Sequence, residues 1–146
     1  AGLIPEKDIS KSIDFAIQLM TTTNRNAAEA MLEVGVNAAT DVTGFGILGH
    51  ALNMAEQSRV SIEIHTLPVI KWTPKIAEAL RIPLLEGEGV ETAGGLLISV
   101  PAKRVNRLLN ALKNKGCQGN EVGVVTEGSG KAYLMKDTQV VEVSNP

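Results

Sequence analysis

Cysteine is almost missing from this chain of 146 residues, in which Cys117 is the single one. One cysteine excludes a disulfide within the chain and is typical of proteins that fold in a reducing cytoplasm. Long apolar runs are missing too, since none approaches the ~20 residues that span a bilayer, and the first residues do not look like a signal peptide. These absences predict a cytoplasmic protein that does not enter a membrane.

Basic clusters are also missing, and the formal net charge is -2. Both facts argue against nucleic acid as a main partner. The chain is 44% hydrophobic and 21% charged, an ordinary composition for a globular domain with a real core. Because the chain begins with Ala1 and not with Met, we expect it to be a piece of a longer protein or a processed one.

Apolar spacing divides the chain into alternating helices and strands. Helices are expected from Ser10, from Asn26 to Gly35, from about Phe45 to Gln57, at 76–80, and from Pro101 to Gly116. Strands are expected at 60–65, 94–100, 121–126, 131–135 and 138–143, with the rest of 66–91 as loop. The sequence therefore predicts one domain, 1–146, of the α+β class: a mixed β-sheet covered by helices, mainly on one face.

The segment ATDVTGFGILGH, residues 39–50, is the part of the chain that packing explains least. Read literally, Gly44 to Gly49 is the dinucleotide motif GxGxxG, with Glu63 about 20 residues further on. We reject this interpretation, because Asp41 stands where the apolar first strand of such a fold should lead into the glycines. The chain also has too few strand–helix–strand units for that fold. No Lys-Ser or Lys-Thr follows the glycines, so the segment is not a Walker A loop.

Two interpretations of the segment remain. Glycines at the start of a helix let backbone N–H groups converge, which favours an anion. A carboxylate at Asp41 would repel that anion unless a divalent cation stood between them, and carboxylate with phosphate is a common way to hold Mg²⁺. The alternative is that Asp41 or Thr43 caps the helix while the glycines ease packing.

The same segment resembles the signature DVTGFGLLGH of the C-terminal domain of selenide, water dikinases (selenophosphate synthetases), with Ile47 as the one difference. A second block, ETAGGLLISVP at 91–101, is similar to the family's Gln-Thr-Ser-Gly-Gly-Leu-Leu segment. The helix after Pro101 and EVGVVTE at 121–127 resemble the family more loosely. The wider superfamily includes aminoimidazole ribonucleotide synthetase and shares a two-domain scaffold that uses ATP.

The resemblance implies an enzyme that uses ATP to phosphorylate selenide, with this chain as the domain that closes over the phosphates. Asp41 is then expected to bind Mg²⁺, and Thr43, Gly44, Phe45 and Gly46 to line the phosphate side of the cleft. An N-terminal ATP-binding domain, absent from this chain, or a separate subunit is the expected partner, and a homodimer is expected of the complete protein. That partner would supply the nucleotide pocket and the reactive Cys or selenocysteine. No residue here is therefore assigned a catalytic role, and the chain alone is expected to hold neither Mg²⁺ nor ATP stably.

Departures from the family pattern leave the phosphoryl acceptor open. The connection between Pro68 and Glu91 is short, and 91–93 reads Glu-Thr-Ala in place of Gln-Thr-Ser. Two other classes of function stay open: a stand-alone, non-catalytic binding or regulatory module that docks on a separate ATP-binding subunit, and a structural domain that has lost the site.

Two other residue types could carry chemistry. We expect His50 to support the site residues or to pack in the core rather than to bind metal, since no second His or Cys lies at ligand spacing. Cys117 has no adjacent base and is not expected to be catalytic.

Overall fold

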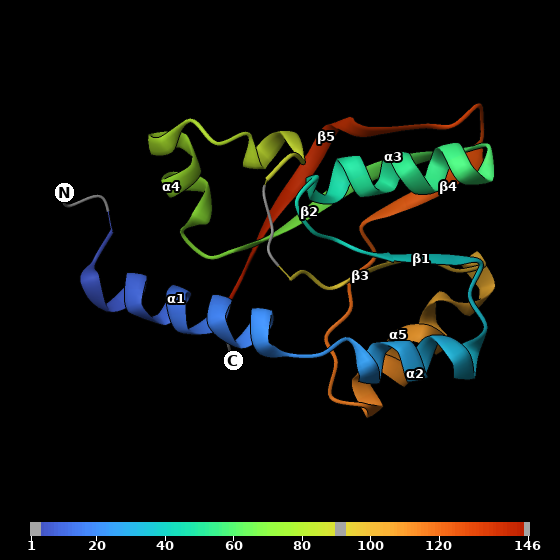
Figure 1. Ribbon diagram of the computed structural model, residues 1–146, viewed down its shortest axis with the longest axis horizontal. Helices are drawn as coiled ribbons and strands as arrows, with labels where there is room; N and C mark the ends of the chain where they lie inside the picture. Colours follow the sequence, from blue (N-terminus) through green and yellow to red (C-terminus); the bar gives the residue numbers. More distant parts are fainter. Residues whose placement is uncertain (1–3, 90–92, 145–146) are drawn as a thin grey trace.

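Figure 1 shows a computed structural model of the chain, which describes residues 4–89 and 93–144. The helices are α1 (Glu6–Thr21), α2 (Arg25–Val34), α3 (Gly46–Ser58), α4 (Thr73–Leu80) and α5 (Val105–Asn114). The strands are β1 (Ala38–Asp41), β2 (Val60–Ile70), β3 (Leu96–Ser99), β4 (Gly123–Glu127) and β5 (Lys131–Val143). The predicted α+β class is confirmed. Within the described ranges, no helix has both the length and the hydrophobicity needed to cross a bilayer.

A three-stranded mixed sheet forms the larger core, in the order β4-β2-β5. Strand β2 runs antiparallel to β4 and parallel to β5. Helix α3 lies along one face of this sheet (Figure 1), where its small residues let it approach the strands closely. The buried residues of this core are Ala51, Met54 and Ala55 from α3, with Ile62, Ile64, Leu67 and Val69 from β2.

A separate two-stranded ribbon, β1 with β3, lies between this core and a second one. Leu97 packs against the α3 core, whereas Ile98, the next residue of β3, packs against the α2–α5 core. This alternation is the period-two side-chain pattern of a strand. The expectation of a single sheet was therefore wrong, because the described strands form two, and the prediction also missed β1.

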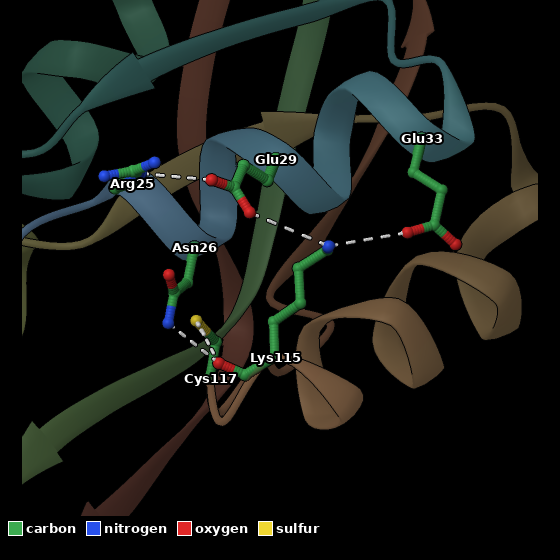
Figure 2. Close-up of polar contacts among 6 residues, drawn as sticks. All are labelled: Arg25, Asn26, Glu29, Glu33, Lys115 and Cys117. Carbon is green, nitrogen blue, oxygen red and sulfur yellow. Dashed lines mark hydrogen bonds and ion pairs between the residues drawn. The ribbon is translucent and has the colours of Figure 1, made fainter.

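Helices α2 and α5 pair through the second core, made of Ala30, Val34, Leu108, Ala111 and Leu112. Figure 2 shows the polar contacts beside it: the Lys115 Nζ lies 3.8 Å from Glu29 Oε2 and 3.7 Å from Glu33 Oε2. The Asn26 side-chain amide donates to the Lys115 carbonyl at 3.0 Å. Half-exposed ion pairs contribute about 0–1 kcal/mol each, so the apolar core supplies most of the stability. The polar contacts join α2 to Lys115, the C-cap residue of α5.

Some element boundaries differ from those expected. Helix α1 begins at Glu6, ahead of the expected Ser10, with Pro5 as its N-cap residue; the Pro5 carbonyl accepts the Asp8 and Ile9 N–H groups. Helix α2 has Asn24, not Asn26, as its N-cap. Gly35 ends α2 as predicted, with φ at +77°, a conformation that glycine adopts without strain.

Strand β2 continues to Ile70, where a loop was expected because residues 66–91 hold three of the six prolines. The pairing with β4 ends at Ile64, so in the described part of the chain the end of β2 pairs with β5 alone. Proline is tolerated on such an unpaired edge, because its missing N–H removes no ladder bond there. Strand β5 is continuous where two strands were predicted, but its pairing with β2 shifts register between Leu134 and Gln139.

Candidate functional site

The two sequence blocks that carry the family resemblance lie side by side. Asp41 at the end of β1 is in register with Leu96 at the start of β3. The Val42 N–H donates to the Gly95 carbonyl, and the Gly94 N–H donates to the Val42 carbonyl, each at 3.0 Å. The backbone that leads into the glycine turn is therefore held by β3. Glu91 and Thr92, from the second block, lie outside the described residues.

The inner side of the turn packs against the backbone at 87–88. Gly46 is buried and has φ at +65°, and a Cβ there would lie 2.5 Å from the Gly87 carbonyl oxygen. The Leu48 N–H donates to that same oxygen at 2.9 Å. Gly46 is therefore required both by its backbone conformation and by the close approach of another chain segment. Sequence reasoning did not single out Gly87.

His50 supports the same inner side from within α3. Its side chain is buried, and its Nε2 lies 3.0 Å from the Thr43 backbone nitrogen and 3.2 Å from the Thr43 Oγ1. The Thr43 N–H is therefore bound inside the protein and does not face solvent. This contact gives His50 the supporting role expected from the sequence.

The outer side of the turn is open. Asp41 and Gly44 are exposed, Phe45 is 70% exposed, and a Cβ on Gly44 would meet no atom within 4 Å. Among residues 4–89 and 93–144, no acceptor hydrogen-bonds to the N–H groups of Gly44 and Phe45. The short exposed segment 41–45 thus carries a carboxylate and two backbone donors for which the described residues provide no acceptor, a combination that suits a group with both anionic oxygens and a cation.

Phe45 is the N-cap residue of helix α3, and in the described part of the chain no side chain forms a cap bond there. The alternative that Asp41 or Thr43 caps the helix is therefore wrong. The first N–H of the helix, from Gly46, is instead satisfied by the Thr43 carbonyl at 2.9 Å.

A shallow hollow of about 480 Å³ lies next to Asp41, between the start of α2 and the β1–β3 ribbon. Asn24, the N-cap of α2, and Arg25, its first residue, line it on one side, and Thr40 and Asp41 of β1 line it on the other. Asn24 also donates through its side-chain amide to the Gly94 carbonyl at 3.2 Å. The hollow places a basic side chain and the carboxylate on the same surface, although Arg25 is also paired with Glu29 at 3.1 Å.

The residues present fit one ligand of a Mg²⁺ site and not a whole site. In the part of the chain that is described, no three His, Cys, Asp or Glu side chains gather where they could hold a metal ion. Mg²⁺ prefers near-octahedral oxygen ligands, and Asp41 offers one exposed carboxylate. Other groups, such as phosphates, water or another protein surface, must complete the coordination. Whether Thr43 to Gly46 line a phosphate site stays a prediction.

Comparisons with known proteins support the family resemblance that the two sequence blocks carry. The chain is 47% identical to the selenide, water dikinase of Methanocaldococcus jannaschii over 96% of its length, and 45% identical to that of Methanococcus maripaludis over 96%. It is 38% identical to human selenide, water dikinase 2 over 97%. The chain spans 42%, 44% and 33% of these three proteins, less than half of each.

A family model that describes the AIR synthase related protein, C-terminal domain, matches residues 4–136, which include β1, the glycine turn and the β3 block. The resemblance inferred from the sequence is confirmed, and the chain belongs to the family of AIR synthase related protein C-terminal domains.

Proposed function

We propose that this chain is the C-terminal part of an ATP-dependent phosphotransferase of the selenide, water dikinase kind, in which residues 41–46 form the Mg²⁺–phosphate side of the active-site cleft. The observation that carries the proposal is the outer side of the turn. There the exposed Asp41 stands in the same short segment as the N–H groups of Gly44 and Phe45, for which the described residues provide no acceptor. The similarity to selenide, water dikinases over 96% of the chain supports this assignment.

Each exposed group of the turn has a distinct task in this proposal. The N–H groups of Gly44 and Phe45 donate to phosphate oxygens, as at other glycine turns that open a helix. Asp41 offers one carboxylate oxygen to Mg²⁺, which when bound neutralises phosphate charge. The Phe45 ring, 70% exposed, becomes covered when the cleft closes and helps to exclude water.

The proposal requires a partner, because the hollow beside Asp41 is open and residues 4–89 and 93–144 form no closed nucleotide pocket. We assign that role to an N-terminal ATP-binding domain or subunit, and we expect the complete protein to be a homodimer in the cytoplasm. Selenide is the proposed phosphoryl acceptor, since the similar proteins are named selenide, water dikinases.

The test compares two Asp→Asn variants in the full-length protein that contains this chain. Asp41→Asn keeps the size of the side chain but removes its charge, and we expect a fall of ~10²–10³ in selenide-dependent ATP turnover, typical of a lost electrostatic contact in a transition state. Asp137→Asn, an exposed aspartate in β5, is the matched control and should keep its turnover. Near-normal turnover of folded Asp41→Asn would contradict the assignment. ATP binding without selenide-dependent turnover in the unmodified protein would favour the non-catalytic binding module.

A further inference from the structure

His50 is the one buried polar side chain in the described part of the chain. It lies in the second turn of α3, underneath the glycine turn, and its Nε2 accepts a hydrogen bond from the Thr43 backbone N–H at 3.0 Å. A buried polar group is unfavourable unless it is hydrogen-bonded, so this contact accounts for a histidine at a core position.

The bond also determines the tautomer of the neutral ring. A backbone N–H can only donate, so Nε2 must carry a lone pair and the proton of the neutral imidazole must be on Nδ1. The Thr43 hydroxyl, 3.2 Å from the same nitrogen, can share that lone pair as a second donor. An imidazolium would point a donor at the Thr43 N–H, and the contact would be lost.

Two hydrogen bonds hold the peptide units on either side of the Thr43 Cα. His50 binds the unit that contains the Thr43 N–H, and the Gly46 N–H donates at 2.9 Å to the Thr43 carbonyl, in the unit that contains the Gly44 N–H. In a trans peptide the carbonyl and the following N–H point in opposite directions. Because the Thr43 carbonyl points toward the start of α3, the Gly44 N–H must point away from it, toward the open side.

We propose that His50 is a positioning residue: acting through Thr43, it fixes the direction in which the turn presents the Gly44 and Phe45 N–H groups. The identity of the anion that these groups bind rests on the proposed function, but the positioning itself does not. A Cβ on Gly44 would meet no atom within 4 Å, so this side of the turn is open and its backbone depends on the anchor at Thr43. A donor whose direction is fixed before binding loses less entropy when the ligand arrives.

Two variants separate hydrogen bonding from packing. His50→Gln can place its amide oxygen near the position of Nε2 and keep an acceptor, whereas His50→Leu fills the space without one. Nitrogen NMR of the unmodified chain should show Nε2 of His50 unprotonated. In amide hydrogen exchange of the same 146-residue chain, Thr43 should be protected in the unmodified protein and in His50→Gln. It should exchange about ten-fold faster in His50→Leu, as expected when one hydrogen bond is lost.

In the full-length protein, His50→Leu should lower kcat for ATP turnover more than it changes KM, and His50→Gln should restore part of the loss. A protonated Nε2 would overturn the proposal, as would equal Thr43 protection in the two variants. If His50→Leu does not fold, the tautomer of His50 and the exchange rate of the Thr43 N–H in His50→Gln still test the proposal. Rapid Thr43 exchange in a folded His50→Gln protein that keeps full turnover would contradict a positioning role. If the protein proves not to turn over ATP, the proposed function fails, while the tautomer and the exchange rates still test His50.

Discussion

The carbonyl oxygen of Gly87 lies 2.5 Å from the point where a Cβ on Gly46 would stand. That oxygen also accepts the Leu48 N–H, so a segment between α4 and β3 is bound to the first turn of α3. At Gly44, two residues earlier, an added Cβ would meet nothing within 4 Å, and the φ is not positive. The two glycines of one motif therefore serve different purposes: Gly46 allows packing, and Gly44 leaves an open surface.

Alanine at these two positions should produce opposite effects. Gly46→Ala requires a strained backbone and displaces the chain at 87–88, so we expect it to lower the free energy of unfolding by about 2–4 kcal/mol. Gly44→Ala should change stability by less than about 0.5 kcal/mol, because its methyl group meets no neighbour. Urea denaturation of the 146-residue chain measures both values.

The activity of the full-length protein completes this comparison. Gly44→Ala places a methyl group on the surface proposed for phosphate, so it should lower ATP turnover while the protein remains folded. Equal destabilisation by Gly46→Ala and Gly44→Ala would show that Gly46 is not packed closely against the Gly87 carbonyl. Unchanged turnover with Gly44→Ala would argue against phosphate binding at the outer side.

Local signals in the sequence predicted the elements that depend on neighbouring residues. Helix α3 was expected from Phe45 to Gln57 and spans Gly46–Ser58, because its apolar spacing is continuous and a glycine turn precedes it. Strand β1 was missed. It is four residues long, contains two alanines and an aspartate, and pairs with a strand more than 50 residues away, so no local pattern marks it.

The candidate site was predictable in part, because some of its residues are neighbours in the sequence. Asp41 and the glycines are contiguous, so the sequence alone placed them together. Which residues face inward was not predictable, because a turn has no side-chain periodicity and its orientation depends on distant contacts. The Gly87 backbone against Gly46 and His50 beneath Thr43 determine that orientation.

The phenol of Tyr133 should titrate above its ordinary range. Its hydroxyl donates to Glu63 Oε1 at 2.9 Å across the β2–β5 pair, and this hydrogen bond, together with the carboxylate charge, raises the pKa of Tyr133. Tyr133 is the only tyrosine, so ultraviolet titration of the folded chain reports on it alone. Glu63→Gln should move the titration midpoint down toward the ordinary value near 10.

The raised pKa of Tyr133 makes the stability of the fold depend on pH. A folded-state pKa above the unfolded value gives a contribution to stability that is complete below the unfolded pKa and disappears as the pH rises through the folded one. The chain should therefore lose this contribution in alkaline solution, and Glu63→Gln should lose less. Thr126→Val is the control, since Thr126 donates to the same carboxylate oxygen at 3.2 Å without binding Tyr133. If the titration midpoint of Tyr133 is the same in Glu63→Gln, the hydrogen bond is not the cause of the raised pKa.

The 146-residue chain on its own should bind Mg-ATP weakly and should not hydrolyse it. Its exposed turn offers two backbone donors and one carboxylate beside a hollow of about 480 Å³ that stays open to water. Such contacts must overcome an association cost of about 4–15 kcal/mol, and in a wet half-site each is worth little. Mg²⁺ alone should bind weakly too, because one carboxylate supplies a small share of its six oxygens. Isothermal titration should therefore give no micromolar binding of Mg-ATP. Micromolar affinity, or steady phosphate release that Asp41→Ala abolishes, would mean that this chain carries a complete site.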